Sequence, residues 1–163
     1  MPKKKLTMIF FLTTIALLVR DAVALVSVLP PIKLDPTFQK PSISGITEEL
    51  CLDTISRIER VQVPISTDVH PDGQVGISYV HWPAESDVSI VLLHGFDSSC
   101  LEFRRVGSRF ASLGMNTYAV DLLGWGFSQL ENVTSFSASS KVQALESFLQ
   151  HVVRDDFCVA GAS

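Results

Sequence analysis

The sequence predicts an α/β fold in which parallel strands alternate with helices. Three observations carry this prediction: apolar runs at residues 88–93, 116–120 and 157–160, turn residues after each run, and stretches of helical periodicity between them. A nearly continuous apolar run suits a strand that is covered on both faces of a sheet. Strands that alternate with helices form a parallel sheet with crossover connections.

The composition excludes several classes of protein. The chain has 163 residues and a formal net charge of −4, and no basic run follows Lys5, which argues against nucleic acid as a partner. Cys51, Cys100 and Cys158 are scattered without C-x-x-C or metal-ligand spacing, so we expect neither a disulfide framework nor a metal site. Cys158 falls in an apolar strand pattern, where we expect a buried small hydrophobe. We expect no cofactor.

Residues 1–24 read as a signal peptide or membrane anchor. Three lysines precede an apolar stretch over residues 6–19, and an Ala-x-Ala site follows. A secretory signal peptide has this order. If Arg20 and Asp21 are tolerated, the apolar run over residues 6–29 forms an uncleaved anchor with membrane contact. We therefore expect the secretory pathway or a membrane anchor, with the chloroplast as the alternative.

Residues 25–60 read as a proline-rich linker followed by a short helix over residues 47–58. Residues 61–65 then alternate like a strand, and residues 76–82 form the returning strand. We expect this antiparallel pair to open a domain over residues 61–163.

Two histidines flank this predicted hairpin. His70-Pro71-Asp72-Gly73 has the chemistry of a tight turn between the strands, and His81 lies near the end of the second strand. Neither histidine has Asp, Glu or Cys around it in a ligand pattern. We expect both to be surface or turn residues, not ligands or bases.

Two helices are predicted between the later strands. Ser99-x-x-Glu102 is a capping box that begins the first helix, and Gly114 is its stop signal. The second helix begins at Ser140, where Ser140-x-x-Gln143 is the capping box. Its expected apolar face consists of Val142, Leu145, Leu149 and Val152.

Each of the three later strands runs into a turn motif. These are His94-Gly95-Phe96, then Asp121-x-x-Gly124-x-Gly126-x-Ser128, then Gly161-x-Ser163. In this order and spacing they resemble the α/β-hydrolase fold family, and the first two resemble plant α/β-hydrolase-domain proteins. The resemblance covers about residues 76–163. It implies an incomplete α/β-hydrolase sheet: the N-terminal half, with antiparallel first strands and then a parallel βαβαβ unit.

The resemblance also implies roles for the motif residues. Ser163 would be the nucleophile at a strand–turn–helix elbow, and the backbone N–H of Phe96 would be an oxyanion-hole donor. A serine at this position, instead of aspartate, favours acyl transfer from esters, thioesters, amides or carbon–carbon bonds over dehalogenase or epoxide-hydrolase chemistry. The expected scaffold consists of His94, Gly95, Asp121, Gly124, Gly126, Ser128 and Gly161.

The same resemblance places the catalytic acid and histidine after the nucleophile in chain order. Nothing follows Ser163 here, and His151 precedes it in a predicted helix, so we expect no base from this chain. The expectation is an N-terminal fragment of a serine hydrolase for small ester-like substrates, inactive alone, whose strand 157–160 is an unprotected sheet edge. The alternatives are a non-catalytic ligand- or protein-binding module of the same fold and a truncated product without function.

Overall fold

Parallel strands occupy one half of a mixed sheet and antiparallel strands the other. The computed structural model describes residues 32–162, so the predicted signal peptide or anchor and Ser163 lie outside the described residues. Within them the strand order is β1-β2-β3-β5-β4-β6. The strands are β1 (Lys33–Leu34), β2 (Glu59–Pro64), β3 (Gln74–Trp82), β4 (Val88–Leu93), β5 (Thr117–Val120) and β6 (Asp156–Gly161).

The pairing confirms the predicted fold class. β1, β2, β3 and β5 pair antiparallel in that order, while β4 pairs parallel with both β5 and β6. β4 has the predicted bounds, because a branched apolar run with turn residues at both ends leaves little freedom in where the strand starts and stops.

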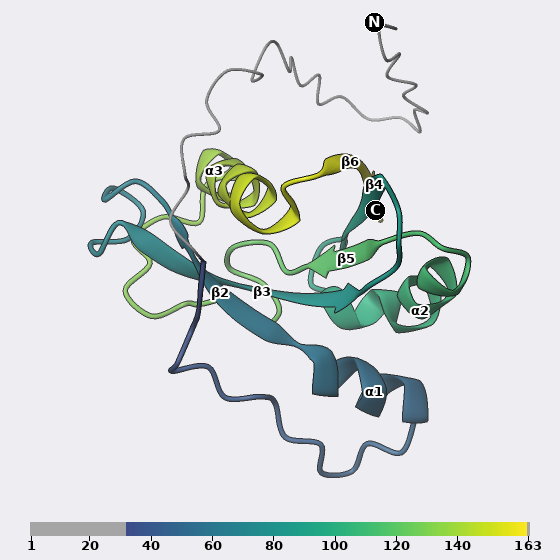
Figure 1. Cartoon of the computed structure of the whole chain (residues 1–163). Helices are drawn as coiled ribbons and strands as arrows, with labels where there is room; N and C mark the ends of the chain where they lie inside the picture. The colour runs from purple at the N-terminus through teal and green to yellow at the C-terminus, as the bar shows by residue number, and fades with distance from the viewer. Residues whose placement is uncertain (1–31, 163) are drawn as a thin grey trace, which may run out of the picture.

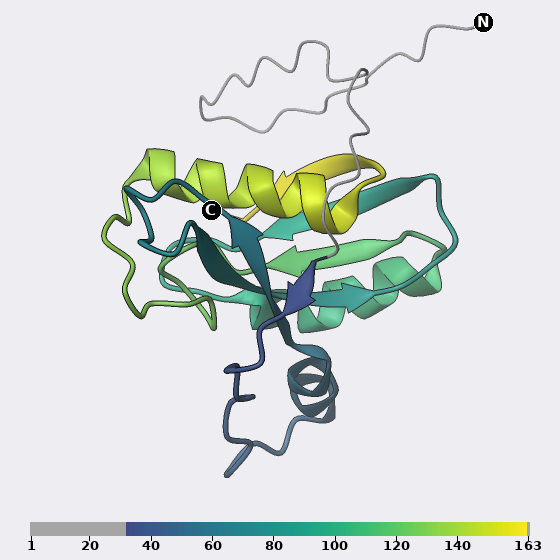
Figure 2. The same ribbon diagram turned by 60° about the vertical axis from the view of Figure 1, so that its left-hand side comes forward.

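In the described part of the chain, three helices cover the two faces of the sheet. They are α1 (Glu49–Arg57), α2 (Arg104–Ser112) and α3 (Ala138–Phe148); a 3₁₀ turn, Cys100–Phe103, leads into α2, and a π-type turn, Leu149–Val153, extends α3. α3 lies on one face, and α1 and α2 lie on the other (Figures 1 and 2). None of the helices within residues 32–162 combines the length and apolar character needed to cross a membrane.

Each face of the sheet has its own core. On the α3 side, Phe148 is fully buried, and its ring centroid lies 5.2 Å from that of Tyr79. On the α2 side, Trp82 packs against Gly107, where an added Cβ would lie 2.3 Å from the indole ring. The close approach of α2 to the sheet therefore requires a glycine at position 107.

α3 begins earlier than predicted. Ser137, not Ser140, is the N-cap, and its Oγ accepts a hydrogen bond from the Ser140 N–H at 3.2 Å. The serine-rich run offers several possible caps, so local sequence does not single one out. The predicted apolar face is confirmed in part: Leu149 is buried, and Leu145 and Val152 pack against the same core. The prediction for Val142 is wrong, because it is 39% exposed, while Ala144, Ser147 and Phe148 are the buried residues of α3 itself.

β6 is the outermost strand on its side of the described sheet. It pairs with β4, and all six of its residues are exposed. The expected sheet edge is therefore confirmed. The expected burial of Cys158 is wrong, because every residue of β6, Cys158 included, is exposed.

The two hairpin histidines lie where the sequence placed them along the chain, but both are more packed than expected. His81 lies near the end of β3 and is partly buried, its ring stacks on Tyr118 at 4.2 Å, and its Nε2 lies 2.7 Å from Asn116 Oδ1. His70 does lie in the predicted turn, but it is buried, with its Nδ1 accepting from the Asp72 N–H. Packing against residues distant in sequence decides both positions.

Candidate active site

The ends of the parallel strands bring the predicted motifs to one edge of the sheet. In the register, Leu93 of β4 lies beside both Val120 of β5 and Gly161 of β6. The N–H of Ala162 continues this pairing by donating to the Leu93 carbonyl oxygen at 2.9 Å. In open α/β sheets, ligands bind at the carboxyl ends of the strands. Ser163, the predicted nucleophile, lies outside the described residues.

Asp121 anchors the loop that follows β5. Its side chain is completely buried. One carboxylate oxygen accepts from the Cys100 N–H at 2.6 Å; the other accepts from Ser78 Oγ at 2.6 Å and the Phe127 N–H at 3.0 Å. A buried carboxylate is costly unless hydrogen bonds replace its lost hydration. These bonds tie the loop to β3 and to the start of the α2 segment.

The two glycines of this loop have steric reasons to be glycine. Gly126 has φ +57°, and a Cβ there would lie 2.3 Å from the Asp121 carboxyl carbon. Gly124 has φ +88°, and a Cβ there would lie 2.7 Å from the Phe136 ring. Both the backbone conformation and the space exclude larger residues. At Gly161, by contrast, a Cβ would meet no described atom within 4 Å, and the structure gives no steric account of that glycine.

Ser128 and Cys100 complete the packing around Asp121. Ser128 Oγ accepts from the Ser78 N–H at 3.1 Å and donates to the Asp121 carbonyl oxygen at 3.0 Å. Burial, and then the neighbouring Asp121 carboxylate, raise the pKa of the Cys100 thiol far above its ordinary value. The thiol therefore stays protonated and is not a nucleophile.

His94 links the loops after β4 and β5. Its Nε2 accepts from the Leu122 N–H at 3.1 Å, which places the proton on Nδ1, and that N–H donates to the Gly95 carbonyl oxygen at 2.8 Å. The ring is buried and neutral in this arrangement. Both nitrogens are used within the loops, so His94 has no nitrogen free for general-base catalysis.

The loop after β4 exposes an aromatic side chain to solvent, whereas the loop after β5 surrounds the buried Asp121 side chain. The Phe96 side chain is 89% exposed, and its ring meets Trp125 edge-to-face with 4.9 Å between centroids. Asp97 has φ +54°, a conformation that non-glycine residues seldom adopt. Among the described residues, none accepts a hydrogen bond from the Phe96 N–H.

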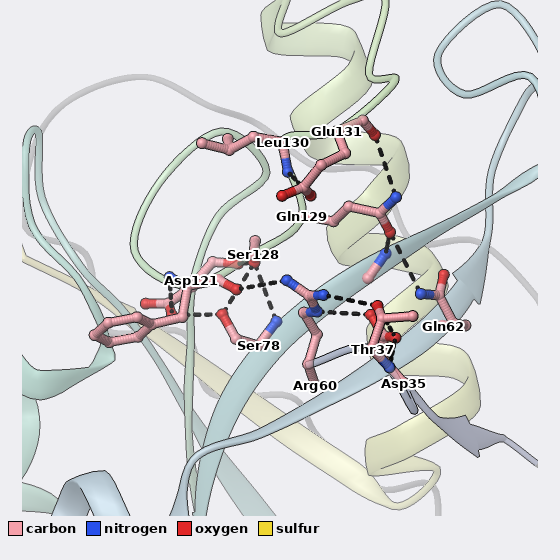
Figure 3. A network of polar contacts seen from close by, with 12 residues as sticks. Asp35, Thr37, Arg60, Gln62, Ser78, Asp121, Ser128, Gln129, Leu130 and Glu131 are labelled. Carbon is pink, nitrogen blue, oxygen red and sulfur yellow. Dashed lines mark hydrogen bonds and ion pairs between the residues drawn. The ribbon is translucent and has the colours of Figure 1, made fainter. Parts of the chain in front are cut away.

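A buried ion pair supports the far end of the β5 loop. Arg60 Nε donates to Asp35 Oδ2 at 2.7 Å, and Arg60 Nη1 donates to the Phe127 carbonyl oxygen at 3.5 Å. Figure 3 shows Arg60 between Asp35 and the end of the loop. Burial opposes the charge on Asp35, but hydrogen bonds from Thr37 and the Arg60 guanidinium together lower its pKa. Sequence reasoning missed this pair, because its two residues lie 25 positions apart without a motif.

Figure 3 also shows a second set of contacts at this loop, centred on Gln129. The Gln129 Oε1 accepts from the Gly76 N–H at 2.9 Å and from Gln62 Nε2 at 3.3 Å. Its amide nitrogen lies 3.1 Å from the buried His70 ring.

No three His, Cys, Asp or Glu side chains within residues 32–162 are grouped to hold a metal ion.

The mixed sheet, covered on both faces and with its motif loops at the ends of the parallel strands, has the arrangement of part of the α/β-hydrolase fold, and solved structures of that fold match it. Residues 84–160 match the family model described as serine aminopeptidase, S33. Over 129 residues the chain is 33% identical to the α/β hydrolase domain-containing protein VTE7 of Arabidopsis thaliana. That match covers 78% of this chain and 39% of the Arabidopsis protein.

Solved structures share the same fold at low identity. A putative lipase of Acinetobacter baumannii superposes with a TM-score of 0.53 at 16% identity, over 75% of this chain and 40% of its own. The epoxide hydrolase VrEH1 of Vigna radiata gives a TM-score of 0.52 at 19% identity, over 66% of this chain and 33% of its own. The haloalkane dehalogenase DatA of Agrobacterium tumefaciens gives a TM-score of 0.51 at 19% identity, over 65% of this chain and 33% of its own. This chain therefore spans about a third to two fifths of each protein.

Proposed function

We propose that this chain carries the nucleophile and one oxyanion donor of a serine hydrolase that works by acyl transfer. Ser163 is the nucleophile in this proposal, and the Phe96 N–H is the donor. One observation carries it: the register sets Gly161 beside Leu93, and the Ala162 N–H bonds to the Leu93 carbonyl oxygen. The strand that leads to Gly-x-Ser thus ends beside the strand that leads to His-Gly-Phe.

The chemistry follows from these two groups. Attack by the Ser163 hydroxyl on a carbonyl carbon would move negative charge onto the carbonyl oxygen, and a backbone N–H stabilises that charge. The unpaired Phe96 N–H suits this use. The reaction class covers esters, thioesters, amides and activated carbon–carbon bonds, with small molecules as substrates.

The histidines of this chain do not supply the general base. All four lie in the described part of the chain. His70 and His94 have both ring nitrogens within hydrogen-bonding distance of polar groups in their own surroundings. His81 pairs with Tyr118 near the start of β5, and His151 precedes the start of β6, so both belong to the amino ends of these strands and not to the carboxyl ends that Ser163 follows. A serine without a base is a weak nucleophile.

We therefore expect the 163-residue chain to have little or no hydrolase activity by itself. The same observation favours a second candidate, a ligand-binding module of this fold that does not turn over substrate.

Hydrolysis of 4-nitrophenyl butyrate separates these possibilities. The 163-residue chain and any longer product of the same transcript are assayed, each with and without Ser163→Ala. Turnover by the longer product that falls about a thousandfold or more in Ser163→Ala supports the hydrolase. An inactive longer product supports the binding module, and turnover by the short chain that survives Ser163→Ala contradicts the proposed site.

We also propose that residues 1–24 direct the chain to the secretory pathway or anchor it in a membrane. A fluorescent fusion of residues 1–30 tests this proposal. Secretion or membrane fluorescence supports it, and chloroplast import contradicts it.

A further inference from the structure

We propose that Asn132 is an N-glycosylation site, which receives its sugar chain from a lipid-diphosphate-linked oligosaccharide. The modification goes beyond the hydrolase proposal and uses none of the residues of that site. It rests on the proposed entry of the chain into the secretory pathway, because the sugar donor and its transferase are found there.

The chain has two asparagines, which differ in motif and in burial. Asn132-Val133-Thr134 has the acceptor pattern Asn-x-Ser/Thr, with a residue other than proline in the middle. Asn116 lacks this pattern, and its buried side chain donates to Ser89 Oγ at 2.9 Å. Asn132 is exposed, and its side chain has no hydrogen-bond partner among the described residues. Of the two, Asn132 alone offers an amide nitrogen that a sugar chain can occupy.

Asn132 lies at the tip of a tight turn. The Val133 N–H donates to the Leu130 carbonyl oxygen at 3.3 Å, which closes a four-residue turn. Asn132 is the third residue of this turn and has φ +59°. Asparagine is among the few residues that tolerate this left-handed conformation. The residue therefore suits both the turn and the acceptor motif, and its exposed position leaves room for a bulky modification.

Both ends of this turn are held by other contacts. Before the tip, the Gln129 N–H donates to the Gly76 carbonyl oxygen at 2.8 Å, and the Gln129 side-chain amide donates to the Glu131 carbonyl oxygen at 3.2 Å (Figure 3). After the tip, the Thr134 N–H donates to the Val69 carbonyl oxygen at 2.9 Å. None of these bonds uses the side chain at the tip, so a sugar chain attached there leaves them in place.

The Thr134 hydroxyl indicates when the transfer takes place. Its Oγ1 donates to the Asp68 carbonyl oxygen at 2.6 Å and lies 3.0 Å from the Val69 carbonyl oxygen. The transferase reads the hydroxyl of the acceptor motif, and these contacts occupy it in the folded chain. Transfer therefore precedes the folding of residues 129–137, and the folded turn then displays the sugar chain.

The transfer is a substitution at the first sugar of the donor. The Asn132 Nδ2 attacks the anomeric carbon, so a carbon–nitrogen bond forms and the bond from that carbon to the diphosphate oxygen breaks. The lipid diphosphate leaves with the electron pair of the broken bond, and the amide nitrogen releases one proton. Nothing is oxidised or reduced.

Two exposed apolar side chains near the tip give the sugar chain a physical use. Leu130 is 55% exposed and Phe136 is 43% exposed, and both lie within four residues of Asn132. Exposed apolar surface promotes association, whereas a sugar chain is bulky and solubilising. We therefore expect the sugar chain to shield these two side chains.

Cell-free translation in the presence of endoplasmic-reticulum microsomes tests the site. The 163-residue chain is made with its own N-terminus and, separately, behind a cleavable secretory signal peptide that the microsomes accept. Protection from added protease measures entry into the microsomes. We expect the protected chain to run as a larger species on a denaturing gel, and endoglycosidase H to return it to the size of the unmodified chain.

Matched variants assign the sugar chain to residue 132. Asn132→Asp keeps the size of the side chain and tolerates φ +59°, but it has no amide nitrogen, so we expect complete loss of the larger species. Thr134→Ser is the control, because it keeps the acceptor motif and is expected to retain the larger species.

Two results would overturn the site. They are a protected chain of unmodified size behind the added signal peptide, and a larger species that persists in Asn132→Asp. A chain that is modified only behind the added signal peptide leaves the site standing and refutes the proposed targeting by residues 1–24. The hydrolase assay on Ser163→Ala is independent of all these outcomes.

Discussion

The loops after β5 and β4 lie at the same edge of the sheet and are built in opposite ways. The β5 loop, residues 121–128, surrounds a fully buried carboxylate that accepts hydrogen bonds from two other segments, at Ser78 and Cys100, and from the loop's own Phe127 N–H. The β4 loop, residues 94–99, holds its histidine inside but turns Phe96 outward and leaves that residue's N–H unpaired. The contrast separates buried residues that hydrogen bonds join to other segments from a residue that is exposed and has an unpaired N–H.

The difference has an energetic meaning. A hydrogen bond to a charged group contributes about 1.5–3 kcal/mol, and a buried partner left unpaired costs a similar amount. The β5 loop therefore tolerates little change. The β4 loop can lose the Phe96 side chain at small cost to the fold, and the predictions below follow this order.

The largest expected effect is that of Gly126→Ala. The new Cβ would lie 2.3 Å from the Asp121 carboxyl carbon, and residue 126 has φ +57°. Hydrogen bonds hold the Asp121 carboxyl group in place, so it cannot move away from the new Cβ. We expect a loss of about 3–5 kcal/mol in the free energy of unfolding, measured by urea denaturation. Gly114→Ala is the control, with φ +82° and no atom within 4 Å, and should cost only about 1–2 kcal/mol. Equal losses would show that the Asp121 contact does not matter.

Asp121→Asn ranks second. The amide keeps the size of the side chain but loses the charge and points two donors where Asp121 has only acceptors. We expect a loss of about 2–3 kcal/mol in unfolding free energy. Ser78→Ala, which removes one of the donors, is expected to cost about 1 kcal/mol. A result in which Ser78→Ala costs as much as Asp121→Asn would contradict the central place of the carboxylate.

The third prediction concerns how the free energy of unfolding changes as the pH falls. Thr37 and Arg60 lower the pKa of Asp35 in the folded state, against the opposing effect of burial. A lowered folded pKa stabilises the protein above the ordinary carboxyl pKa of about 3.9, and that stabilisation is lost as pH falls through the folded value. We therefore expect unfolding free energy to fall less steeply in Asp35→Asn than in the wild type between about pH 5 and pH 2. Identical pH profiles would mean that the ion pair does not support the loop.

The smallest effect on stability is expected for Phe96→Ala. The side chain is 89% exposed, so its removal should change the free energy of unfolding by no more than about 0.5 kcal/mol. A stability loss above about 2 kcal/mol would place Phe96 among the structural residues and remove the contrast between the loops.

Local sequence was sufficient where one short pattern decides the structure. The apolar run of β4 and the stop at Gly114, with φ +82°, follow from patterns of a few residues. The start of α3 could not be predicted, because Ser137 and Ser140 are both acceptable caps. The periodicity of α3 correctly placed Leu145, Leu149 and Val152 against the core, and only Val142 of the predicted face is exposed.

Much of the site's support comes from distant residues. Ser78 meets Asp121 from 43 positions away, and Lys141 reaches Trp125 from a different element. Such partners follow from the sheet order, in which β5 lies between β3 and β4. The motifs at residues 94–96 and 121–128 indicated where the site lies, but not which neighbours hold it.

Backbone amide hydrogen exchange of the 163-residue chain tests the contrast between the loops most directly. The amides of Cys100 and Phe127 donate to the buried Asp121 carboxylate, whereas the Phe96 amide has no acceptor among the described residues. We predict that Phe96 exchanges at nearly its unfolded rate, while Cys100 and Phe127 exchange at least about a thousandfold more slowly. A protected Phe96 amide would contradict the account, in which that amide has no hydrogen-bond acceptor. Cys100 and Phe127 amides that exchange as fast as Phe96 would contradict it too, because both are expected to be held by the Asp121 carboxylate.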